Sequence, residues 1–368
     1  MRWQVDRRGL MAAGTALAIG GCTTTRPLRS LASVAAPAPC LPRVQVDPTR
    51  VIRTVAGLRP FRPSGFVVRG ETMGDTRLVH NYGHGGGGIS LSWGSSRLAT
   101  SLGLPGHSGS VAVIGAGIMG LTTARLVQEA GYRVTIYTET LPPGTTSNIA
   151  GGQIFPTGYF SDDQVTPQFR EQAAAAADYS RRRFQIMAGD DYGIRWLPTY
   201  DQTRMTGPLV PDPRFPGRVR LSSDEHPFPL DNVVRYNTMY VETGRFLERL
   251  LRDIRVAGGQ VTVRRFASPA EVAALPERLV FNCTGLGAAA LFGDTELIPV
   301  RGQLAVLIPQ PEVQYAYSLG AGYMFPRGDG ILLGGTYERG EYLAEPQAED
   351  IADIVESHRG LMAGLRCA

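Results

Sequence analysis

The chain has 368 residues, of which 43% are hydrophobic and 19% charged. This is an ordinary globular composition, and a chain of this length can bury enough core for about two domains. The formal net charge of +4 includes Arg2, Arg7 and Arg8, which lie in a segment that we expect to be removed. The mature chain is then close to neutral, which argues against a nucleic-acid partner. The four cysteines form no Cys-x-x-Cys pair and no zinc-binding spacing, which argues against a metal site.

The first 22 residues resemble a bacterial export signal. Arg7 and Arg8 precede a modest apolar run over residues 10–19, and Ile-Gly-Gly-Cys ends at Cys22. The run is too short to span a bilayer, paired arginines are typical of a twin-arginine signal, and Ile-Gly-Gly-Cys is typical of a lipobox. We expect an exported, periplasmic protein that meets the membrane only through a lipid on Cys22, with residues 23–48 as a disordered tether. The alternative is an ordinary disordered N-terminus, because the residues around the arginines fit the twin-arginine pattern loosely.

A run of four glycines, residues 85–88, follows an extended stretch over residues 51–63 and a short predicted strand over residues 76–80. Ordering glycines is costly, because each loses much backbone freedom on folding. The run therefore indicates close backbone approach to something flat or crowded, and the aromatic residues at its edges favour this over a flexible linker. His84 is the one histidine that could serve as a base, but its glycine-rich setting favours a structural hydrogen bond.

A dinucleotide-binding unit is predicted from residue 111 onward. The apolar run Val111 to Ile114 indicates a parallel strand buried on both faces. Gly-x-Gly-x-x-Gly and an amphipathic segment, residues 121–130, follow it, and a second strand, Arg133 to Tyr137, ends next to an acid. In this pattern the glycines permit a tight turn, close approach of a pyrophosphate and helix packing, and the acid accepts a hydrogen bond from a ribose hydroxyl. The unit does not choose between FAD and NAD. Its predicted cofactor contacts are Gly115, Gly117, Ile118, Met119, Gly120 and Glu139.

The rest of the chain alternates between helical and extended patterns. Residues 190–229 contain aromatic residues and prolines without helical periodicity, so we expect strands and loops there. The other predicted elements are helices over residues 167–187, 243–256 and 346–365, and strands over residues 279–285, 300–308 and 330–337.

Several stretches together resemble the D-amino-acid oxidase family of FAD enzymes. They are VAVIGAGIMGLTTARL, TTSNIAGG, FNCTG, PVRGQ, ILLGGT, LRPFRP and HNYGHGGGGISLSWG. The resemblance implies FAD as the cofactor and an α/β fold, in which a Rossmann-like doubly wound FAD-binding domain carries a second, mixed-sheet substrate domain. Residues 76–187 plus 242–298 would form the FAD-binding domain, and residues 188–241, 299–366 and 49–75 the substrate domain.

The order of these motifs departs from that family. LRPFRP and HNYGHGGGG lie near the C-terminus in the family, but here they precede the nucleotide-binding strand. The segment from Glu349 to Leu365 resembles the helix that would lead directly into Arg50 to Arg53. We therefore expect a circularly permuted chain joined through residues 98–110, which is allowed where native termini are close together. A misassembled or truncated gene is the alternative, disfavoured because the pieces account for the full set of family motifs once each.

The resemblance also implies the catalytic residues. Arg59 matches the arginine whose two charge-assisted bonds hold the substrate carboxylate, and Arg62 is the competing choice. Tyr323 matches a tyrosine whose hydroxyl touches that carboxylate, and Gly86 matches the glycine whose carbonyl accepts from the substrate amine. The family's second tyrosine falls on Leu319 here. The candidates to replace it are Tyr240, Tyr315 and Tyr317.

The remaining cofactor contacts implied by the resemblance come from the glycine run and from TTSNIAGG. The hydroxyl and amide groups of Thr-Thr-Ser suit a phosphate or ribose, although this tripeptide could equally be a plain turn, and the glycine pair is expected beside the flavin. These contacts are Gly85, Gly87, Gly88, Ile89, Ser90, Thr145, Thr146, Ser147, Gly151 and Gly152.

The reaction that the resemblance implies is oxidative deamination of a D-amino acid. A hydride passes from the α carbon to flavin N5, and the imino acid hydrolyses to a 2-oxo acid and ammonia. The expected partners are a small D-amino acid or related amine and either oxygen or a respiratory electron acceptor. The alternatives are a secondary-amine oxidase of the glycine or sarcosine type, or a catalytically silent flavin-binding scaffold, which Leu319 keeps open.

Overall fold

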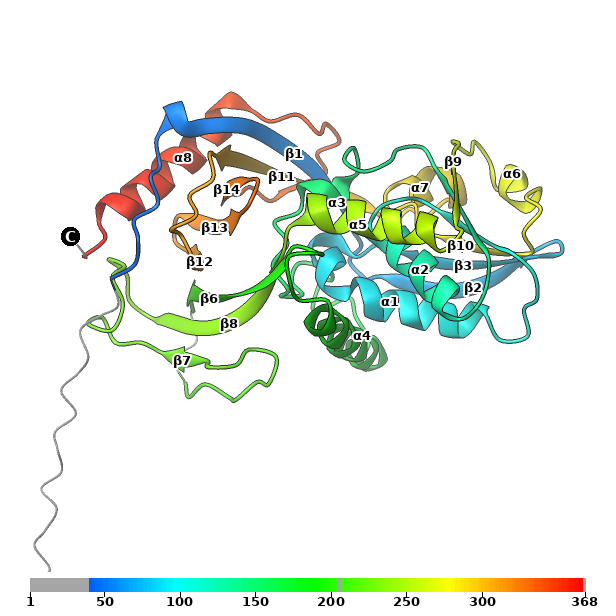
Figure 1. The fold of residues 1–368 in the computed structure, drawn as a ribbon, viewed down its shortest axis with the longest axis horizontal. Coiled ribbons are helices and arrows are strands. Elements are labelled where there is room, and N and C mark those ends of the chain that lie inside the picture. Colours follow the sequence, from blue (N-terminus) through cyan, green and yellow to red (C-terminus); the bar gives the residue numbers. More distant parts are fainter. Residues whose placement is uncertain (1–39, 204–206, 367–368) are drawn as a thin grey trace, which may run out of the picture. The chain divides into compact units, whose positions relative to one another are not determined.

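The computed structural model describes residues 40–203 and 207–366. The expected export signal and the tether up to residue 39 lie outside these ranges. Two β-sheets, of six and nine strands, organise the described residues (Figure 1). Within the same ranges, no helix combines the length and the apolar character that a membrane crossing requires.

The six-stranded sheet has the order β2-β3-β10-β4-β5-β9. All of its neighbours are parallel except β2 and β3, which form an antiparallel hairpin. The central strands β10 and β4 are buried at every residue, as the apolar run in the sequence predicts. The strands are β2 (Val67–Met73), β3 (Thr76–Tyr82), β10 (Leu279–Asn282), β4 (Val111–Ile114), β5 (Val134–Thr138) and β9 (Gln260–Val263).

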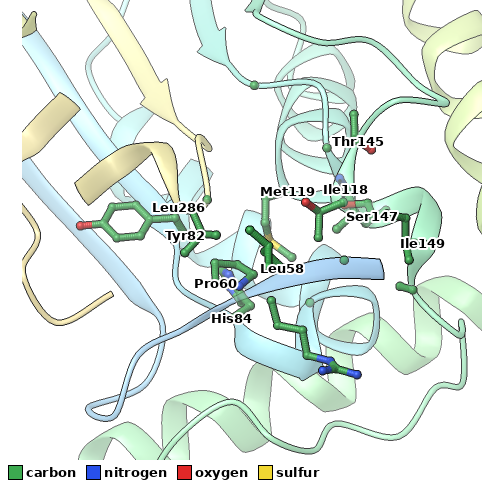
Figure 2. A pocket seen from close by; sticks show the side chains of 18 of the residues that line it. Leu58, Pro60, Tyr82, His84, Ile118, Met119, Thr145, Ser147, Ile149 and Leu286 are labelled. Carbon is green, nitrogen blue, oxygen red and sulfur yellow. Dashed lines mark hydrogen bonds between the residues drawn. The ribbon is translucent and has the colours of Figure 1, made fainter. Parts of the chain in front are cut away.

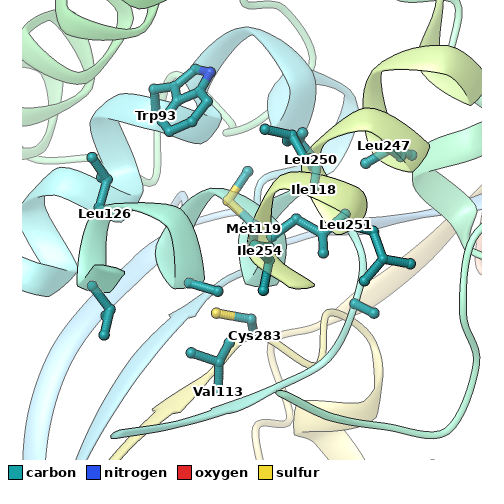
Figure 3. Close-up of a cluster of buried hydrophobic side chains, with 14 of the residues drawn as sticks. Trp93, Val113, Ile118, Met119, Leu126, Leu247, Leu250, Leu251, Ile254 and Cys283 are labelled. Atoms are coloured by element: carbon teal, nitrogen blue, oxygen red, sulfur yellow. The ribbon is translucent and has the colours of Figure 1, made fainter. Parts of the chain in front are cut away.

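Helices cover both faces of this sheet. On one face, Val113 of β4 packs in a cluster with Trp93, Leu121 and Phe246 from three helices (Figure 3). On the other, Ala112 and neighbouring side chains pack against the shorter helices. This confirms the predicted doubly wound arrangement, because alternate residues of each strand face opposite layers. The first layer holds α1 (Gly88–Gly103), α2 (Ile118–Glu129), α4 (Pro167–Ile186) and α5 (Thr243–Val256), and the second holds α6 (Pro269–Ala273) and α7 (Gly287–Phe292).

The nine-stranded sheet is mixed, as predicted. Its order is β1-β11-β14-β13-β12-β6-β8-β7, with β15 pairing β11, and every pairing is antiparallel except that of β12 with β6. The strands are β1 (Val51–Phe61), β11 (Ile298–Leu307), β14 (Gly330–Gly334), β13 (Gly322–Arg327), β12 (Ala316–Leu319), β6 (Ile194–Gln202), β8 (Val233–Val241), β7 (Val219–Arg220) and β15 (Glu338–Arg339). The remaining elements are α8 (Ala348–Ala363), α3 (Thr146–Ile149) and the 3-10 turns η1 (Pro48–Arg50) and η2 (Gly85–Gly87).

One face of the nine-stranded sheet packs against α8. Leu333 of β14 and Tyr317 of β12 lie in one apolar cluster with Leu361 of the helix. On the opposite face, Phe325 and Leu304 belong to a separate cluster. The alternation of side chains along each strand therefore decides which residues reach the helix and which reach the other side.

Two of the segment limits expected from the sequence are wrong. Residues 41–48 are not a disordered tether, because Val44 is 1% exposed and the N–H of Gln45 donates to Gln310 Oε1 at 2.7 Å. Their alternating Val-x-Val pattern buries one side of an extended segment, a short signal within a stretch whose composition indicates a linker. Residues 67–73 do not belong with the substrate sheet, because β2 pairs along its length with β3 of the six-stranded sheet.

Candidate active site

A cavity of about 1000 Å³ contains residues from both sheets. The loops after β3, β4, β5 and β10 line one part of it, and β1, β11, β12 and β13 line the other. Ligands commonly bind at the carboxyl ends of strands in such sheets. Among the predicted site residues, those that line the cavity are Arg59, Gly85, Gly86, Gly88, Ile89, Gly115, Gly117, Ile118, Met119, Glu139, Thr145, Thr146, Ser147, Gly151, Gly152 and Tyr323.

Three predicted cofactor contacts lie behind the cavity wall. A Cβ on Gly120 would come within 1.9 Å of the Gly115 carbonyl oxygen, so this glycine lets α2 pack against the turn. A Cβ on Gly87 would meet Leu91 at 3.1 Å. The hydroxyl of Ser90 donates to the carbonyl of Gln153 at 3.1 Å. These three residues therefore shape the wall of the cavity, and their contact with the cofactor stays a prediction.

The turn between β4 and α2 brings backbone N–H groups to the cavity. Gly115 has a φ of 107°, which favours glycine, and a Cβ there would lie 2.5 Å from the Cys283 carbonyl oxygen. Ile118 N–H at the start of α2 donates to Ser147 Oγ at 3.0 Å, and Figure 2 shows Ile118 and Ser147 side by side. Ser147 and its threonine neighbours thus stand at a helix N-terminus, where anionic phosphate groups are favoured.

Three charged side chains follow β5 and β9 and line the part of the cavity that is predicted to bind the nucleotide. Glu139 follows β5 and lies 3.6 Å from Arg265, and both side chains are exposed. Arg264 and Arg265 line the cavity and were not predicted from the sequence, although their position directly after β9, the parallel strand at the edge of the sheet, is a usable signal. Together with the glycine turn and the hydroxyl groups, these residues fit a dinucleotide with its ribose and pyrophosphate.

The residues that are predicted to bind the substrate lie together in the part of the cavity that β1, β11, β12 and β13 line. Arg59 of β1 lies against Gly302, where a Cβ would come within 2.2 Å of its guanidinium, and its Nη1 donates to the Thr336 carbonyl at 3.4 Å. Tyr323 of β13 lines the same part of the cavity, and burial raises its pKa although the positive charge of Arg59 opposes the rise. A Cβ on Gly86 would lie 3.7 Å from Arg59 Cδ. Residues from opposite ends of the chain thus meet at one point.

Arg62, the competing choice for carboxylate binding, is occupied by structural partners. Its side chain bonds to Asp294 at 3.0 Å and Glu296 at 2.8 Å. Arg59 has no carboxylate partner among the described residues. A buried or half-buried guanidinium without an internal anion is suited to bind an anionic ligand group.

None of the candidate replacements for the second tyrosine lines the cavity. Leu319, Tyr317 and Tyr315 belong to the cluster under α8, because these alternate residues of the β12 segment point away from the face that carries Tyr323. Tyr240 faces the cavity side, but its hydroxyl is held by Gln153 at 2.9 Å. The alternation along β12 therefore turns Tyr315 and Tyr317 away from the cavity, and Tyr240 of β8 does not line it although it lies on the same side.

Tyr337, one residue after the ILLGGT stretch, is the aromatic residue that sequence reasoning missed. It lines the cavity, and its ring lies 5.8 Å from the Arg59 guanidinium carbon. Its side chain is half exposed, so it stands at the rim and contributes both an apolar face and a hydroxyl group beside the arginine.

His84 makes the structural hydrogen bond that its sequence setting predicts. Its Nε2 lies 2.6 Å from Ser95 Oγ, and its ring stacks on Phe66 with 4.7 Å between centroids. Burial lowers the pKa of His84 to about 3, so the ring is neutral at physiological pH. Within residues 40–203 and 207–366, no cluster of three or more His, Cys, Asp or Glu side chains is arranged to hold a metal ion.

Comparisons with known proteins agree with this geometry. A model of the DAO family, described as FAD dependent oxidoreductase, matches residues 10–102 and 110–367. A D-amino-acid oxidase from Streptomyces coelicolor is 32% identical over 259 residues, which cover 68% of this chain and 76% of the relative. A D-aspartate oxidase from Homo sapiens is 29% identical over 259 residues, covering 67% of this chain and 73% of the relative. The crystal structure of iminodiacetate oxidase from Chelativorans sp. BNC1 shares the fold, with a TM-score of 0.52 at 17% sequence identity. The superposed residues make up 69% of this chain and 79% of the oxidase chain.

Proposed function

Because this chain belongs to the DAO family of FAD-dependent oxidoreductases, we propose that it oxidatively deaminates D-amino acids. Its cofactor is FAD, and its general reaction is the oxidation of an amine. The proposal rests on one observation above all. Arg59 is half-buried, has no carboxylate partner within residues 40–203 and 207–366, and lines the same cavity as Tyr323 and the glycine turn that fits a dinucleotide.

The residues of this chain have separate tasks in the proposed reaction. Arg59 and the Tyr323 hydroxyl hold the substrate carboxylate, and the carbonyl of Gly86 accepts from the amine, so the α carbon is fixed between them. The substrate loses a hydride from the α carbon and a proton from nitrogen, which forms a carbon–nitrogen double bond. Water then converts this imino acid into a 2-oxo acid and ammonia. Bound FAD supplies the two-electron acceptor, and oxygen or a respiratory carrier reoxidises it.

The test uses the colour of the flavin under anaerobic conditions. The purified protein should be yellow, and a D-amino acid should bleach it while the L enantiomer should not. A colourless protein would overturn the proposal. Bleaching by glycine or N-methyl amino acids in preference to D-amino acids would identify a secondary-amine oxidase, and a yellow protein that no amine bleaches would be the silent scaffold.

The charges around the substrate part of the cavity favour neutral side chains. The charged residues of the described lining are Arg59 and three at the nucleotide end, Glu139, Arg264 and Arg265. A second charge on the substrate would therefore be buried without a partner, which is costly.

A kinetic comparison tests the side-chain proposal. We expect kcat/KM for D-aspartate and D-lysine to be at least about tenfold below that for D-alanine or D-methionine, since an unpaired buried charge costs more than about 1.4 kcal/mol. D-Aspartate as the best substrate would contradict this reasoning and would match the activity named for the human relative.

We further propose that the chain is a circular permutation of the family fold. The family model matches in two segments, and β1 and β3 each pair with strands from distant parts of the chain. Arg43 donates to the Leu365 carbonyl at 3.4 Å, so the start of the described chain adjoins the residues that follow α8. A re-permuted variant, beginning near Ser110, joining Ala368 to Pro48 and ending near Leu104, should fold and bind FAD. An unfolded variant beside a yellow natural protein would contradict the proposal.

Export is proposed separately, on the sequence pattern alone. Replacing Arg7 and Arg8 by lysine should leave the folded protein inside the cell, because a twin-arginine route requires both arginines. Replacing Cys22 by serine should release it from the membrane fraction. Export that persists in the double lysine variant would contradict the twin-arginine assignment.

A further inference from the structure

We propose that Gln303, from the far face of the nine-stranded sheet, holds Tyr337 and the Thr336 carbonyl in place beside Arg59. Gln303 is then a positioning residue for substrate capture, and Tyr337 belongs to the wall that receives the substrate. This role rests on the proposed function, in which Arg59 holds the substrate carboxylate. It gives a task to the PVRGQ stretch, residues 299–303, which the proposed reaction otherwise leaves without one.

The strand β11 presents its residues alternately to the cavity and to α8. Gly302 lines the cavity, whereas Gln303 is fully buried and bonds to the start of α8. The Gln347 N–H donates to Gln303 Oε1 at 2.6 Å, and Gln303 Nε2 donates to Asp350 Oδ2. Neighbouring residues of a strand point to opposite faces of the sheet, so Gln303 lies behind the cavity wall.

The residues on both sides of Tyr337 are bound to this buried glutamine. The Gln303 N–H donates to Thr336 Oγ1 at 3.1 Å, and Gln303 Nε2 also donates to Glu338 Oε1 at 2.8 Å. The Thr336 hydroxyl donates to the same Glu338 oxygen, and Arg301 Nε donates to the other one at 2.7 Å. The side-chain amide of Gln303 is thus fully satisfied, as buried amides usually are. We call Arg301, Gln303, Thr336 and Glu338 the clamp.

Between its two anchors in the clamp, the chain carries Tyr337 on the cavity side. Tyr337 lines the cavity, and its ring lies 5.8 Å from the Arg59 guanidinium carbon. A Cβ on Gly158 would lie 3.9 Å from Tyr337 Cε2, and the Gly158 carbonyl accepts from the Gly86 N–H at 2.8 Å. The ring therefore lies between Arg59 and the loop that contacts Gly86, the two residues that the proposed reaction assigns to the substrate.

The clamp also supports Arg59 through the backbone. Arg59 Nη1 donates to the Thr336 carbonyl at 3.4 Å, so a shift of Thr336 moves the acceptor that orients the guanidinium. Glu338 is the next acid along the chain, but Gln303 and Arg301 bind its two oxygens. The donors of Arg59 are therefore left for a carboxylate in the cavity, and capture of that carboxylate depends on their orientation.

Two substitutions at Thr336 separate positioning from stability. Thr336→Val keeps the shape of the side chain and removes the hydroxyl that bonds to Gln303 and Glu338, whereas Thr336→Ser keeps the hydroxyl. The assay is anaerobic flavin bleaching by the amino acid that reduces the natural protein fastest. We expect Thr336→Val to raise the half-saturating substrate concentration about tenfold, with the limiting rate and FAD content within twofold. Thr336→Ser should restore the natural value within twofold. No rise in Thr336→Val, or a serine variant as poor as the valine variant, would overturn the proposal.

Gln303→Met tests the clamp from its centre, and Gln310→Met is the matched control. Gln310 is also a buried glutamine, but its amide bonds to the backbone of Gln45 and it does not line the cavity. Gln303→Met should raise the half-saturating substrate concentration at least about tenfold. Gln310→Met should lower only the midpoint of denaturation. An equal rise in both variants would mean that lost stability alone is responsible, which contradicts a positioning role.

Hydrogen exchange of the FAD-bound protein tests the clamp without any substrate. The Gly340 N–H donates to the Pro299 carbonyl at 2.9 Å, so it reports whether the segment after Tyr337 stays on β11. In Thr336→Val this amide should exchange at least about tenfold faster than in the natural protein, while the amides of α5 stay unchanged. Unchanged exchange at Gly340 would refute the clamp whichever amine the protein oxidises. A protein that no amine bleaches would contradict the proposed function instead, and the exchange rates would still decide the clamp.

Discussion

Replacing Arg59 by alanine should abolish most substrate capture while leaving FAD bound and the fold intact. The guanidinium makes one long hydrogen bond, 3.4 Å to the Thr336 carbonyl, and no ion pair within the described residues, so its loss breaks no internal charge pair. Two parallel bonds to a carboxylate contribute about 1.5–3 kcal/mol each. Their loss corresponds to a fall in kcat/KM of about 10²–10⁴, at about 1.4 kcal/mol per tenfold change.

The assay is the rate of anaerobic flavin bleaching as a function of D-amino-acid concentration. Arg62→Ala is the matched control, because it removes bonds to Asp294 and Glu296 on the same segment of chain. The control should lower the midpoint of denaturation and leave kcat/KM near the natural value. The reasoning is refuted if Arg59→Ala keeps kcat/KM within about threefold, or if Arg62→Ala loses substrate capture without loss of stability.

The remaining predictions concern three other positions. Gly302→Ala places a Cβ within 2.2 Å of the Arg59 guanidinium, so it should raise KM at least about tenfold with FAD content unchanged, and steady-state kinetics with a flavin absorbance ratio measures both. Gly115→Ala combines a φ of 107° with a 2.5 Å approach to the Cys283 carbonyl oxygen, so the protein should purify colourless or insoluble; a yellow, active variant would contradict the proposed role of the turn. Burial lowers the pKa of His358 from 6.5 to about 4 in the folded state, so the unfolded chain takes up a proton first as the pH falls, and stability is lost between about pH 6.5 and 4. His358→Gln should therefore flatten the dependence of unfolding free energy on pH in that window by about 1.4 kcal/mol per pH unit, as measured by urea denaturation at several pH values, and an unchanged slope would count against it.

The nucleotide unit was predictable because its signals are local. A buried apolar strand, three glycines and the following helix lie within one short stretch, and two of the glycines meet a steric requirement of the turn itself: Gly115 through its φ of 107° and Gly120 through its close approach to the Gly115 carbonyl oxygen. The meeting of Arg59 with Tyr323 came instead from the family resemblance, because no local pattern relates residues on β1 and β13.

The features that were missed depend on pairing between distant segments. Whether Tyr317 or Tyr323 faces the cavity is decided by strand register, and Arg265 reaches the cavity only because β9 pairs with β5. The burial of Val44 likewise requires α8, more than 300 residues later in the chain. Composition contains none of this information, and the Val-x-Val alternation at residues 44–46 is too short to decide the matter, so the sequence indicated a linker for residues 41–48 and left the second tyrosine open.

The pairing of β1 and β3 has a consequence for how the molecule folds. These strands belong to the first part of the described chain, but β1 pairs with β11 and β3 is flanked by β10, both more than 200 residues further on. Contacts of such long sequence separation slow folding, because a large loop must close before they form. Neither sheet can be completed on the ribosome until β10 and β11 have emerged. Until then, β1 and β3 have unpaired edges, which exposes the nascent chain to aggregation by edge-to-edge pairing.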